Sequence, residues 1–319
     1  MDLIDRKILC ELDLNCRIPI SQLAKKLRIS RNVAAYRIKN LEKEKIITQY
    51  ICSLNLGLLG YKTYKIYYEV KSGNALQEQE FVQKIIEDKR VIHSLKTEGA
   101  FDYSVTVVVK NISELDDFMM GLKNEFKDLI KDYFIGILIY SKIFKLQKLL
   151  LEQKQSIPKV EKYAGEDKQI ALDDKDLKIL SAFAQSANLS VLELAKKTKL
   201  SLDIVKYRLK MLNKCGLMHF RVKFDFDKLG YYHYIVLLKV RQATKADEEK
   251  LITWCLLRKN VIYCNKRLGE YDFEINAAIK DINELNDFIA ELKSNFHDII
   301  DSYTTVINTK LLKINYVPF

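Results

Sequence analysis

The first 60 residues carry apolar positions at helical spacing, interrupted by residues that cap or break helices. One helix is predicted from four apolar residues spaced one to four positions apart: Ile4, Ile8, Leu9 and Leu12. Residues 17–20, which include Pro19, end it. Ser21 and Ser30 are predicted to cap two further helices. The predicted core faces of these two helices are Leu23, Ala24 and Leu27 in one, and Val33, Ile38 and Leu41 in the other. With a hairpin expected over residues 46–54, this order is that of a winged helix-turn-helix.

After Gly60 the pattern changes to a period of two. Residues 64–70 place Tyr64, Ile66, Tyr68 and Val70 on one face and Lys65, Tyr67 and Glu69 on the other, which predicts a half-buried strand. A helix containing Phe81, Ile85 and Ile86 follows, and then strands over residues 91–96 and 103–109. Ser113, with Asp116 at the N3 position, is predicted to cap a helix that buries Leu115, Phe118, Leu122 and Phe126. An apolar strand over residues 133–140 completes a βαββαβ order, which is that of a ferredoxin-like sandwich.

The chain contains this unit twice. Residues 91–126 and 261–296, at an offset of 170, are identical at 14 of 36 positions, and residues 24–45 and 195–216, at an offset of 171, at 9 of 22. Asp173 or Asp174, Ser190 and Ser201 are predicted to start the three helices of the second copy, whose third helix turns Val205, Leu209 and Leu212 toward the core. A repeat of this length is longer than a solenoid repeat of up to roughly 50 residues, so it indicates two fused subunits. The halves of such a chain can diverge, whereas a homodimer presents the same surface twice.

The predicted fold class is therefore α+β, with two helix-turn-helix modules alternating with two ferredoxin-like domains. The expected DNA-binding modules are residues 1–59 and 171–229, and the expected sensing domains are residues 60–149 and 230–319. Residues 150–170, which are polar and include Pro158 and Gly165, are interpreted as the linker. The two sensing domains are expected to pair within the chain through apolar sheet surface, which makes the chain a pseudo-dimer, and further self-association stays open.

Charge is concentrated in the predicted helical modules. Residues 1–60 hold 11 Lys/Arg against 6 Asp/Glu and residues 170–230 hold 12 against 7, so the two segments carry +5 each of a net charge of +11. Two basic modules on a nearly neutral remainder favour two contacts with a polyanion, whereas a charge that serves solubility alone has no reason to segregate. No apolar run approaches the roughly 20 residues that span a bilayer, and the acidic, helix-like N-terminus is not that of a signal peptide.

Cysteine and histidine usage indicates no metal site. The six cysteines form no CxxC pair and do not repeat between the halves, which favours free thiols in a reducing cytoplasm. The four histidines have no histidine counterpart in the other half and no metal-ligand spacing, and are interpreted as ordinary strand, wing and surface residues: His93, His219, His233 and His297. No cofactor and no catalytic residue is predicted, because the chain has no phosphate-binding glycine loop, no Gly-x-Ser-x-Gly and no repeated acid pair.

Four motifs in order resemble the Lrp/AsnC family of prokaryotic transcription regulators. They are residues 30–41 (SRNVAAYRIKNL) and 201–212 (SLDIVKYRLKML) in the helical modules, and residues 99–103 (GAFDY) and 269–273 (GEYDF) in the sensing domains. The resemblance covers nearly the whole chain and implies double-stranded DNA as the partner and a place on the nucleoid. The fusion is a departure, since typical members carry one unit per chain.

The third helix of each module is predicted to enter the major groove with the face that does not pack on its own domain. The candidate DNA-binding residues are Arg31, Asn32, Tyr36, Arg37, Lys39 and Lys43 in the first copy, and Asp203, Lys206, Tyr207, Arg208, Lys210 and Lys214 in the second; Ala35 is also expected to face outward. Arg37 falls toward the inner side, where it braces the motif or meets phosphate. Lysine rows are also common on solvated helix faces, but their repetition within two basic modules favours DNA. Asp203 either reads a cytosine amino group or weakens the second module, and both make the halves unequal.

The resemblance also implies that small effectors, often amino acids, bind near the Gly-x-x-Asp turns. The candidate effector-binding residues are Gly99, Asp102, Gly269 and Asp272. The alternative is a purely structural turn, in which glycine permits the tight bend and aspartate accepts hydrogen bonds from local amides.

Two other functions stay open. Siroheme decarboxylases resemble this family in fold. Of the histidine-containing cluster that those enzymes carry near their second strand, this chain has only one similar residue, His93, and its counterpart in the second half is Tyr263. An architectural chromatin protein, which binds DNA with little specificity, is the third class.

Overall fold

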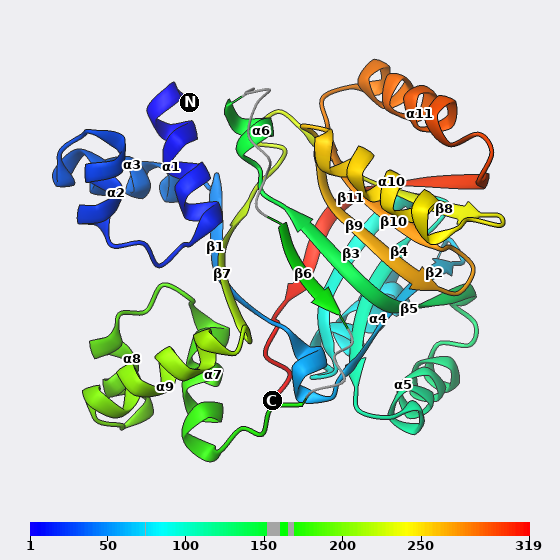
Figure 1. Ribbon diagram of the computed structural model, residues 1–319. Helices are drawn as coiled ribbons and strands as arrows, with labels where there is room; N and C mark the ends of the chain where they lie inside the picture. Colours follow the sequence, from blue (N-terminus) through cyan, green and yellow to red (C-terminus); the bar gives the residue numbers. More distant parts are fainter. Residues whose placement is uncertain (74, 152–159, 165–168) are drawn as a thin grey trace.

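The computed structural model describes residues 1–73, 75–151, 160–164 and 169–319. Two small helical modules lie side by side on one flank, and a strand-rich body with helices on its outside forms the other (Figure 1). Between them stands a two-stranded ribbon, β1 and β7 (Figure 1).

Each helical module has three helices. They are α1 (Leu3–Leu14), α2 (Ile20–Leu27) and α3 (Arg31–Lys43) in the first, and α7 (Asp174–Gln185), α8 (Val191–Thr198) and α9 (Leu202–Lys214) in the second. Ser30, Ser190 and Ser201 cap their helices as predicted, and Asp173 caps α7, whose first residue is Asp174. The prediction that Ser21 caps α2 is wrong: Pro19, whose ring fixes φ near the helical value, is the N-cap residue, the helix begins at Ile20, and Ser21 lies inside its first turn.

The hairpin predicted over residues 46–54 is also wrong. These residues form one strand, β1 (Ile47–Leu54), which pairs antiparallel with β7 (Met218–Phe224) of the other half. The segment contains no glycine, proline or Asn-Gly pair to make a turn, so it extends and satisfies its backbone groups on its counterpart. The two modules are therefore joined by a shared ribbon instead of each carrying its own hairpin.

The sensing domains follow the predicted βαββαβ order. The first consists of β2 (Lys62–Val70), α4 (Ala75–Glu87), β3 (Val91–Gly99), β4 (Tyr103–Val109), α5 (Ile112–Glu125) and β5 (Ile130–Phe144). The second consists of β8 (Tyr232–Val240), α10 (Lys245–Leu257), β9 (Val261–Leu268), β10 (Phe273–Ile279), α11 (Ile282–Phe296) and β11 (Ile300–Ile314). Asn111, not Ser113, caps α5, because its side chain reaches the amide of Glu114.

Short elements connect these parts. A 3-10 turn, η1 (Leu56–Leu59), precedes β2, and α6 (Gln147–Leu151) follows β5. The predicted linker, residues 150–170, contains β6 (Val160–Ala164), which pairs with β5. Its residues 152–159 and 165–168 lie outside the described residues. The domain boundaries stay predictions.

The two sensing domains close into a single barrel. The strand order is β2-β4-β3-β11-β8-β10-β9-β5, and β5 pairs back with β2. The long last strand of each domain therefore pairs with its own half and with the other, through β5–β9 and β3–β11. The predicted pairing within the chain is present, but it uses strand edges as well as apolar surface.

Barrel closure corrects the prediction of a half-buried strand at residues 64–70. One face of β2 packs under helices, with Tyr64, Ile66 and Tyr68 buried. The other face, with Lys65 at 4% and Tyr67 at 0% exposure, is also buried, because it points into the barrel. Side chains along β2 therefore point alternately into the core under the helices and into the barrel.

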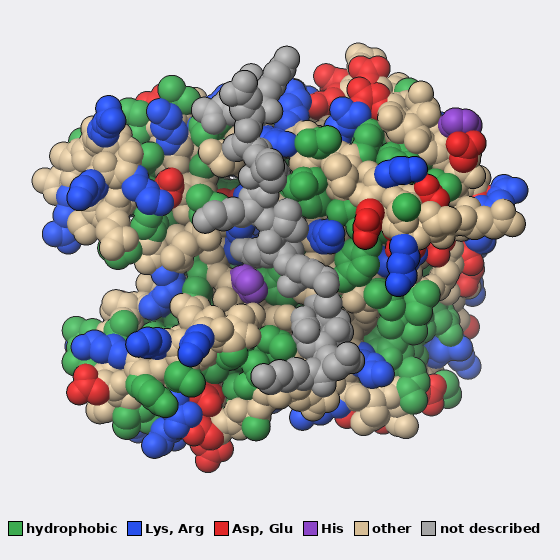
Figure 2. Space-filling model, in the orientation of Figure 1, with side chains coloured by type: hydrophobic (Ala, Val, Ile, Leu, Met, Phe, Trp, Pro, Cys, Tyr) green, Lys and Arg blue, Asp and Glu red, His purple; other side chains and the backbone are tan. Residues whose placement is uncertain are grey.

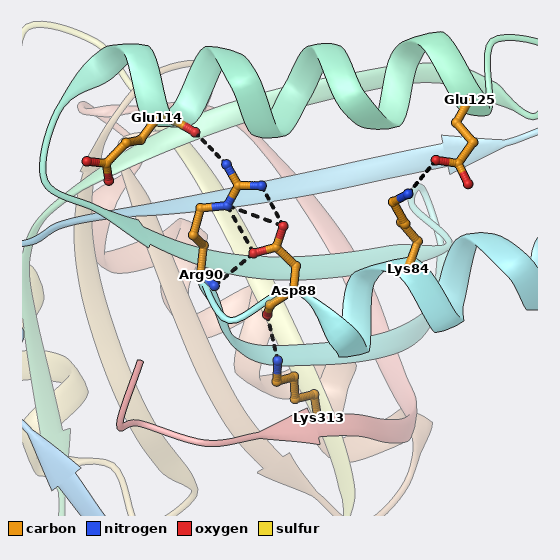
Figure 3. A network of polar contacts seen from close by, with 6 residues as sticks. All are labelled: Lys84, Asp88, Arg90, Glu114, Glu125 and Lys313. Atoms are coloured by element: carbon orange, nitrogen blue, oxygen red, sulfur yellow. Dashed lines mark hydrogen bonds and ion pairs between the residues drawn. The ribbon is translucent and has the colours of Figure 1, made fainter. Parts of the chain in front are cut away.

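Polar contacts also hold the halves together. Lys313 on β11 donates to the backbone oxygen of Asp88 in the first half at 2.7 Å, and Arg90 binds the Asp88 carboxylate and the Glu114 carbonyl (Figure 3). Between the helical modules, Arg17 donates to the carbonyl oxygens of Ala187 and Leu189 at 3.0 and 2.6 Å. The apolar core beneath the ribbon includes residues of both modules. The two helical modules are thus held together by a shared core and by the contacts of Arg17.

Candidate nucleic-acid interface and a chamber beneath it

The recognition helices α3 and α9 present nearly the predicted faces. The following candidates are exposed: Arg31, Asn32, Tyr36, Lys39, Lys43, Asp203, Lys206, Tyr207, Lys210 and Lys214. Val33 is 40% exposed although it was predicted to be inward, and Ala35 is half-buried, because the helix packs through Ala34 and Leu41 instead. The exposed Tyr36 (66%) and Tyr207 (60%) are large apolar rings left without a core. Both faces are therefore available to a partner.

Arg37 and Arg208 have a different role from the other candidates. Arg37 forms ion pairs with Asp2 and Asp5 at 2.7 and 2.8 Å, at the N-terminus of α1. Arg208 repeats this contact in the second module with carboxylates at the start of α7. Each arginine ties the recognition helix to the first helix of its module, which is the bracing role considered for Arg37.

The turn before each recognition helix adds cations that the sequence patterns did not single out. Arg28 and Lys199 end α2 and α8 in the left-handed conformation, with φ of 55° and 57°, and both are exposed. Their equivalence in the two halves was the available signal. Lys and Arg side chains are spread over the outer surface of both modules, which flank a deep notch (Figure 2). The surface has the charge that phosphate contacts require.

The Gly-x-x-Asp turns are engaged in contacts of their own. Asp102 accepts from the backbone amide of Val70, and Asp272 accepts from that of Val240, each at 2.8 Å. Both carboxylates therefore bind backbone amides, as in the structural alternative, but the amides lie 32 residues away on the adjoining strand and not in the turn itself. An effector role for Gly99, Asp102, Gly269 and Asp272 stays a prediction.

The glycines of these turns lie against the other half. A Cβ on Gly269 would come within 2.4 Å of the Ile135 carbonyl oxygen on β5, and one on Gly99 within 3.0 Å of the Thr305 oxygen on β11. Both glycines have positive φ, so two constraints favour glycine there. The motif therefore allows the last strand of each half to cross over the other.

A cavity of about 490 Å³ lies between the β1–β7 ribbon and the barrel. The ribbon contributes Ile51, Ser53, Arg221 and Lys223, and the barrel contributes side chains from β2, β3, β4, β5, β8, β9, β10 and β11. The walls are mixed, with isoleucine and leucine side chains beside charged and aromatic ones. We call this cavity the chamber. Its size is that of a small-molecule site.

A carboxylate with several ion-pair and hydrogen-bond partners lies at one wall of the chamber. Glu274, 3% exposed, pairs with Arg267 at 2.8 Å and accepts hydrogen bonds from Tyr67, Asn265 and Asn276 at 2.9–3.1 Å. Burial by itself would raise the pKa of Glu274, but the charges of Arg267 and Lys65 and the hydrogen bonds from Asn276 and Tyr67 lower this pKa to about 2. Glu274 is thus a fixed anion whose charge is matched by Arg267.

Two lysines and two histidines of the chamber have far fewer polar contacts than Glu274. Lys65 donates to the Thr106 hydroxyl at 3.3 Å, and burial lowers the pKa of Lys65 to about 8. Lys223 lies 5.9 Å from the ring centre of Phe226, and burial lowers its pKa too. Burial and the nearby lysines lower the pKa of His93, and of His233 to about 3, so both rings are neutral.

Sequence reasoning did not identify these residues as a site. They come from strands far apart in the chain, and none belongs to a repeated motif. The available signal was a lysine at position 65 and a glutamate at position 274, each in the middle of a strand-forming segment. The interpretation of His93 and His233 as ordinary strand residues did not anticipate that they line a cavity.

Metal sites and membrane spans are both absent from the described ranges. Among these residues, no group of three or more His, Cys, Asp or Glu side chains is arranged to hold a metal ion. Over the same part of the chain, no helix combines the length and apolarity needed to cross a membrane.

Comparison with known proteins identifies the modules and the unit. The family model of winged helix-turn-helix DNA-binding domains matches residues 1–48 and again residues 172–217. An uncharacterized HTH-type transcriptional regulator of Pyrococcus horikoshii is 30% identical over 162 residues, which are 48% of this chain and 96% of that protein. The proline dehydrogenase transcriptional activator of Rhodobacter capsulatus is 32% identical over 124 residues, 37% of this chain and 78% of its own. These relatives hold one unit where this chain holds two.

The whole chain, in contrast, is similar in fold to one solved protein over nearly its full length. The crystal structure of the siroheme decarboxylase NirDL matches 98% of this chain and 93% of its own, with a TM-score of 0.64 and 18% sequence identity. At that identity the likeness shows the arrangement of modules and barrel. The duplicated helix-turn-helix and the identity over a full unit show that the chain belongs to the Lrp/AsnC family of DNA-binding transcription regulators.

Proposed function

We propose that this chain is a sequence-specific transcription regulator that binds one asymmetric operator as a covalent pseudo-dimer. The observation that carries the proposal is a pair of exposed, non-identical recognition helices mounted on one shared ribbon. Asn32 on α3 suits an adenine edge, whereas Asp203 on α9 suits a cytosine amino group. Acting on chromosomal DNA, the protein would be cytoplasmic and associated with the nucleoid.

Selection of bound fragments from random DNA tests this proposal. The expected product is a site with two different half-sites, about one helical turn or a multiple of it apart, recovered in one orientation. A gel shift with that site and with scrambled DNA is the control. Equal affinity for the two would contradict sequence-specific regulation and favour an architectural role.

We further propose that the chain acts without catalysis. The competing proposal is a siroheme-decarboxylase-like enzyme, favoured by the whole-chain likeness to NirDL, which has also been solved with an iron-uroporphyrin III analogue. Relatives that are 30% and 32% identical to this chain are named as transcription regulators. Incubation with siroheme, followed by its absorption spectrum and product mass, tests the point. Loss of carboxyl groups from the pigment would overturn the proposal.

A further inference from the structure

The chamber holds more positive than negative charge. Among the described residues, five basic side chains line it (Lys62, Lys65, Arg221, Lys223 and Arg267), against two carboxylates, Asp13 and Glu274. Glu274 is fully engaged with Arg267 and its amide and hydroxyl donors. Asp13 accepts from the backbone amide of Leu146. No described carboxylate lies within ion-pair distance of Lys65 or Lys223, and Glu274 and Asp225 act on these two lysines only at longer range.

This imbalance is costly to the empty protein. A buried ammonium group needs a counter-charge or several hydrogen bonds. Lys65, 4% exposed, has one hydroxyl acceptor at 3.3 Å, and the half-buried Lys223 has the ring face of Phe226. Neighbouring neutral histidines add no negative charge. An anionic group bound between Lys65 and Lys223 would supply the missing charge.

The rest of the wall defines the remainder of the ligand. Apolar side chains of the ribbon and barrel, including Ile51, Ile92, Leu95, Ile137 and Ile139, line the same cavity. A volume of about 490 Å³ is far too small for duplex DNA and suits a small molecule. The lining therefore fits an organic anion with an apolar body.

The position of the chamber gives a ligand access to the DNA-binding modules. Arg221 and Lys223 belong to β7, opposite Ile51 and Gln49 of β1. Recognition helix α9 ends at Lys214, four residues before β7 begins, and α3 ends at Lys43, four residues before β1. A ligand in the chamber thus contacts β1 and β7, the two strands that directly follow the recognition helices α3 and α9.

We propose that the chamber binds a small organic anion, held by Lys65 and Lys223, and that its occupancy changes DNA affinity through the β1–β7 ribbon. The second clause rests on the proposed regulatory function, whereas the first does not. This site is distinct from the Gly-x-x-Asp turns, whose carboxylates bind backbone amides. Binding that differs between two ribbon geometries is what couples a ligand to DNA.

The binding clause is tested with 8-anilinonaphthalene-1-sulfonate, an organic anion with an apolar body, and with N-phenyl-1-naphthylamine, which lacks its sulfonate. We expect one sulfonate probe per chain by fluorescence titration. Lys65→Met and Lys223→Met should each weaken it by about 10- to 100-fold, the range for hydrogen bonds to charged groups. The neutral probe should bind each variant as it binds the parent chain. Lys310→Met, which removes an exposed lysine of β11, is the matched control and should leave both probes unchanged.

Two further measurements separate a ligand role from a structural one. Lys65→Arg keeps the charge and should retain the sulfonate probe, and thermal unfolding of Lys65→Met should start no lower than for the parent chain. Equal binding of the sulfonate probe to the parent chain and both methionine variants would overturn the site. A methionine variant that is strongly destabilised, with Lys65→Arg also unable to bind, would assign Lys65 to the fold and overturn the proposal as well.

The coupling clause has its own readout. DNA affinity is measured with and without saturating sulfonate probe, and a change of several-fold that Lys223→Met abolishes is expected. Unchanged affinity in a chain that binds both DNA and probe would overturn the coupling. A chain that binds the probe but no DNA would contradict the proposed function and leave the chamber as a ligand site.

Discussion

The inward faces of the two sensing domains differ where a homodimer would repeat itself. Glu274 on β10 occupies the position that Ser104 holds on β4, 170 residues earlier, and Lys65 on β2 corresponds to Ile235 on β8. All four side chains are buried at 4% exposure or less. In a symmetric pair every inward charge would occur twice, so a carboxylate in one copy would face another like charge. Fusion removes that constraint, and each half supplies a different part of one polar interior.

The outer faces differ less than the interior. Both modules keep the arginine brace, the basic turn residue and an exposed tyrosine on the recognition helix. The difference there is concentrated at single positions such as Asn32 and Asp203. The two halves therefore share most features of the expected DNA-binding surface, whereas they differ in the charges that they place inside the barrel.

The largest expected effect comes from removing the central carboxylate. Glu274→Gln leaves Arg267 buried without its counter-charge and should lower the free energy of unfolding by about 3–5 kcal/mol. Ser104→Ala, at the equivalent position, should change it little, because the Ser104 hydroxyl has no hydrogen-bond partner in the described structure. Denaturant unfolding measures both. Equal losses in the two variants would mean that the halves are not as unequal as their charges suggest.

A second expected effect is a loss of stability in mild acid that depends on His233. Burial and Lys223 lower the pKa of this ring to about 3 in the folded chain, so the unfolded chain binds the proton first as pH falls below its usual value. Stability contributed by the neutral ring is present above about pH 6.5 and should fall by about 2–3 kcal/mol between pH 6.5 and 4.5.

His233→Gln should remove that part of the pH dependence, as measured by urea unfolding at several pH values. His297→Gln, on the exposed end of α11, is the control and should keep the parent slope. A parent slope in His233→Gln would show that His233 is not the group that titrates. The equivalent position in the first half is Thr63, but burial also lowers the pKa of His93 there, so the His233→Gln variant should keep the part of the pH dependence that comes from His93.

The third effect concerns the two half-sites. Asn32→Ala should relax one half-site and Asp203→Ala the other, each by about 1–3 kcal/mol per affected base pair. Asp203→Asn makes the two helices more alike and should move the selected site toward a palindrome. Selection followed by sequencing measures all three. A perfect palindrome recovered with the parent chain would show that the difference between Asn32 and Asp203 is not read.

The smallest effect is that of a single lysine facing a phosphate. Lys39→Ala and Lys210→Ala should each weaken binding to many sequences and reduce the salt slope by roughly one unit for each phosphate that the variant no longer neutralises. Titrations at several salt concentrations measure the slope. A folded double variant with the parent affinity and slope would exclude α3 and α9 as the DNA surface.

The sequence by itself determined the duplication, the fold class and the order of the elements. These follow from local physics: helical spacing of apolar residues, serine and aspartate caps, and alternation in strands. It also singled out α3 and α9, because Asn32, Lys39 and their counterparts must face outward once Leu41 and Leu212 face the core. Errors fell where a local pattern was ambiguous, as with Ser21 and Val33.

The tertiary structure alone decided how the halves join. An extended segment such as β1 has the same pattern whether its partner is a neighbouring strand or β7, more than 160 residues away. Alternation in β2 likewise does not show whether its second face meets water or the inside of a barrel. Only closure of the barrel buries Lys65 and brings Glu274, His93 and His233 around one chamber. The physical reason is that long-range pairing is set by the matching of whole strand edges and surfaces, and no short stretch of sequence contains that information.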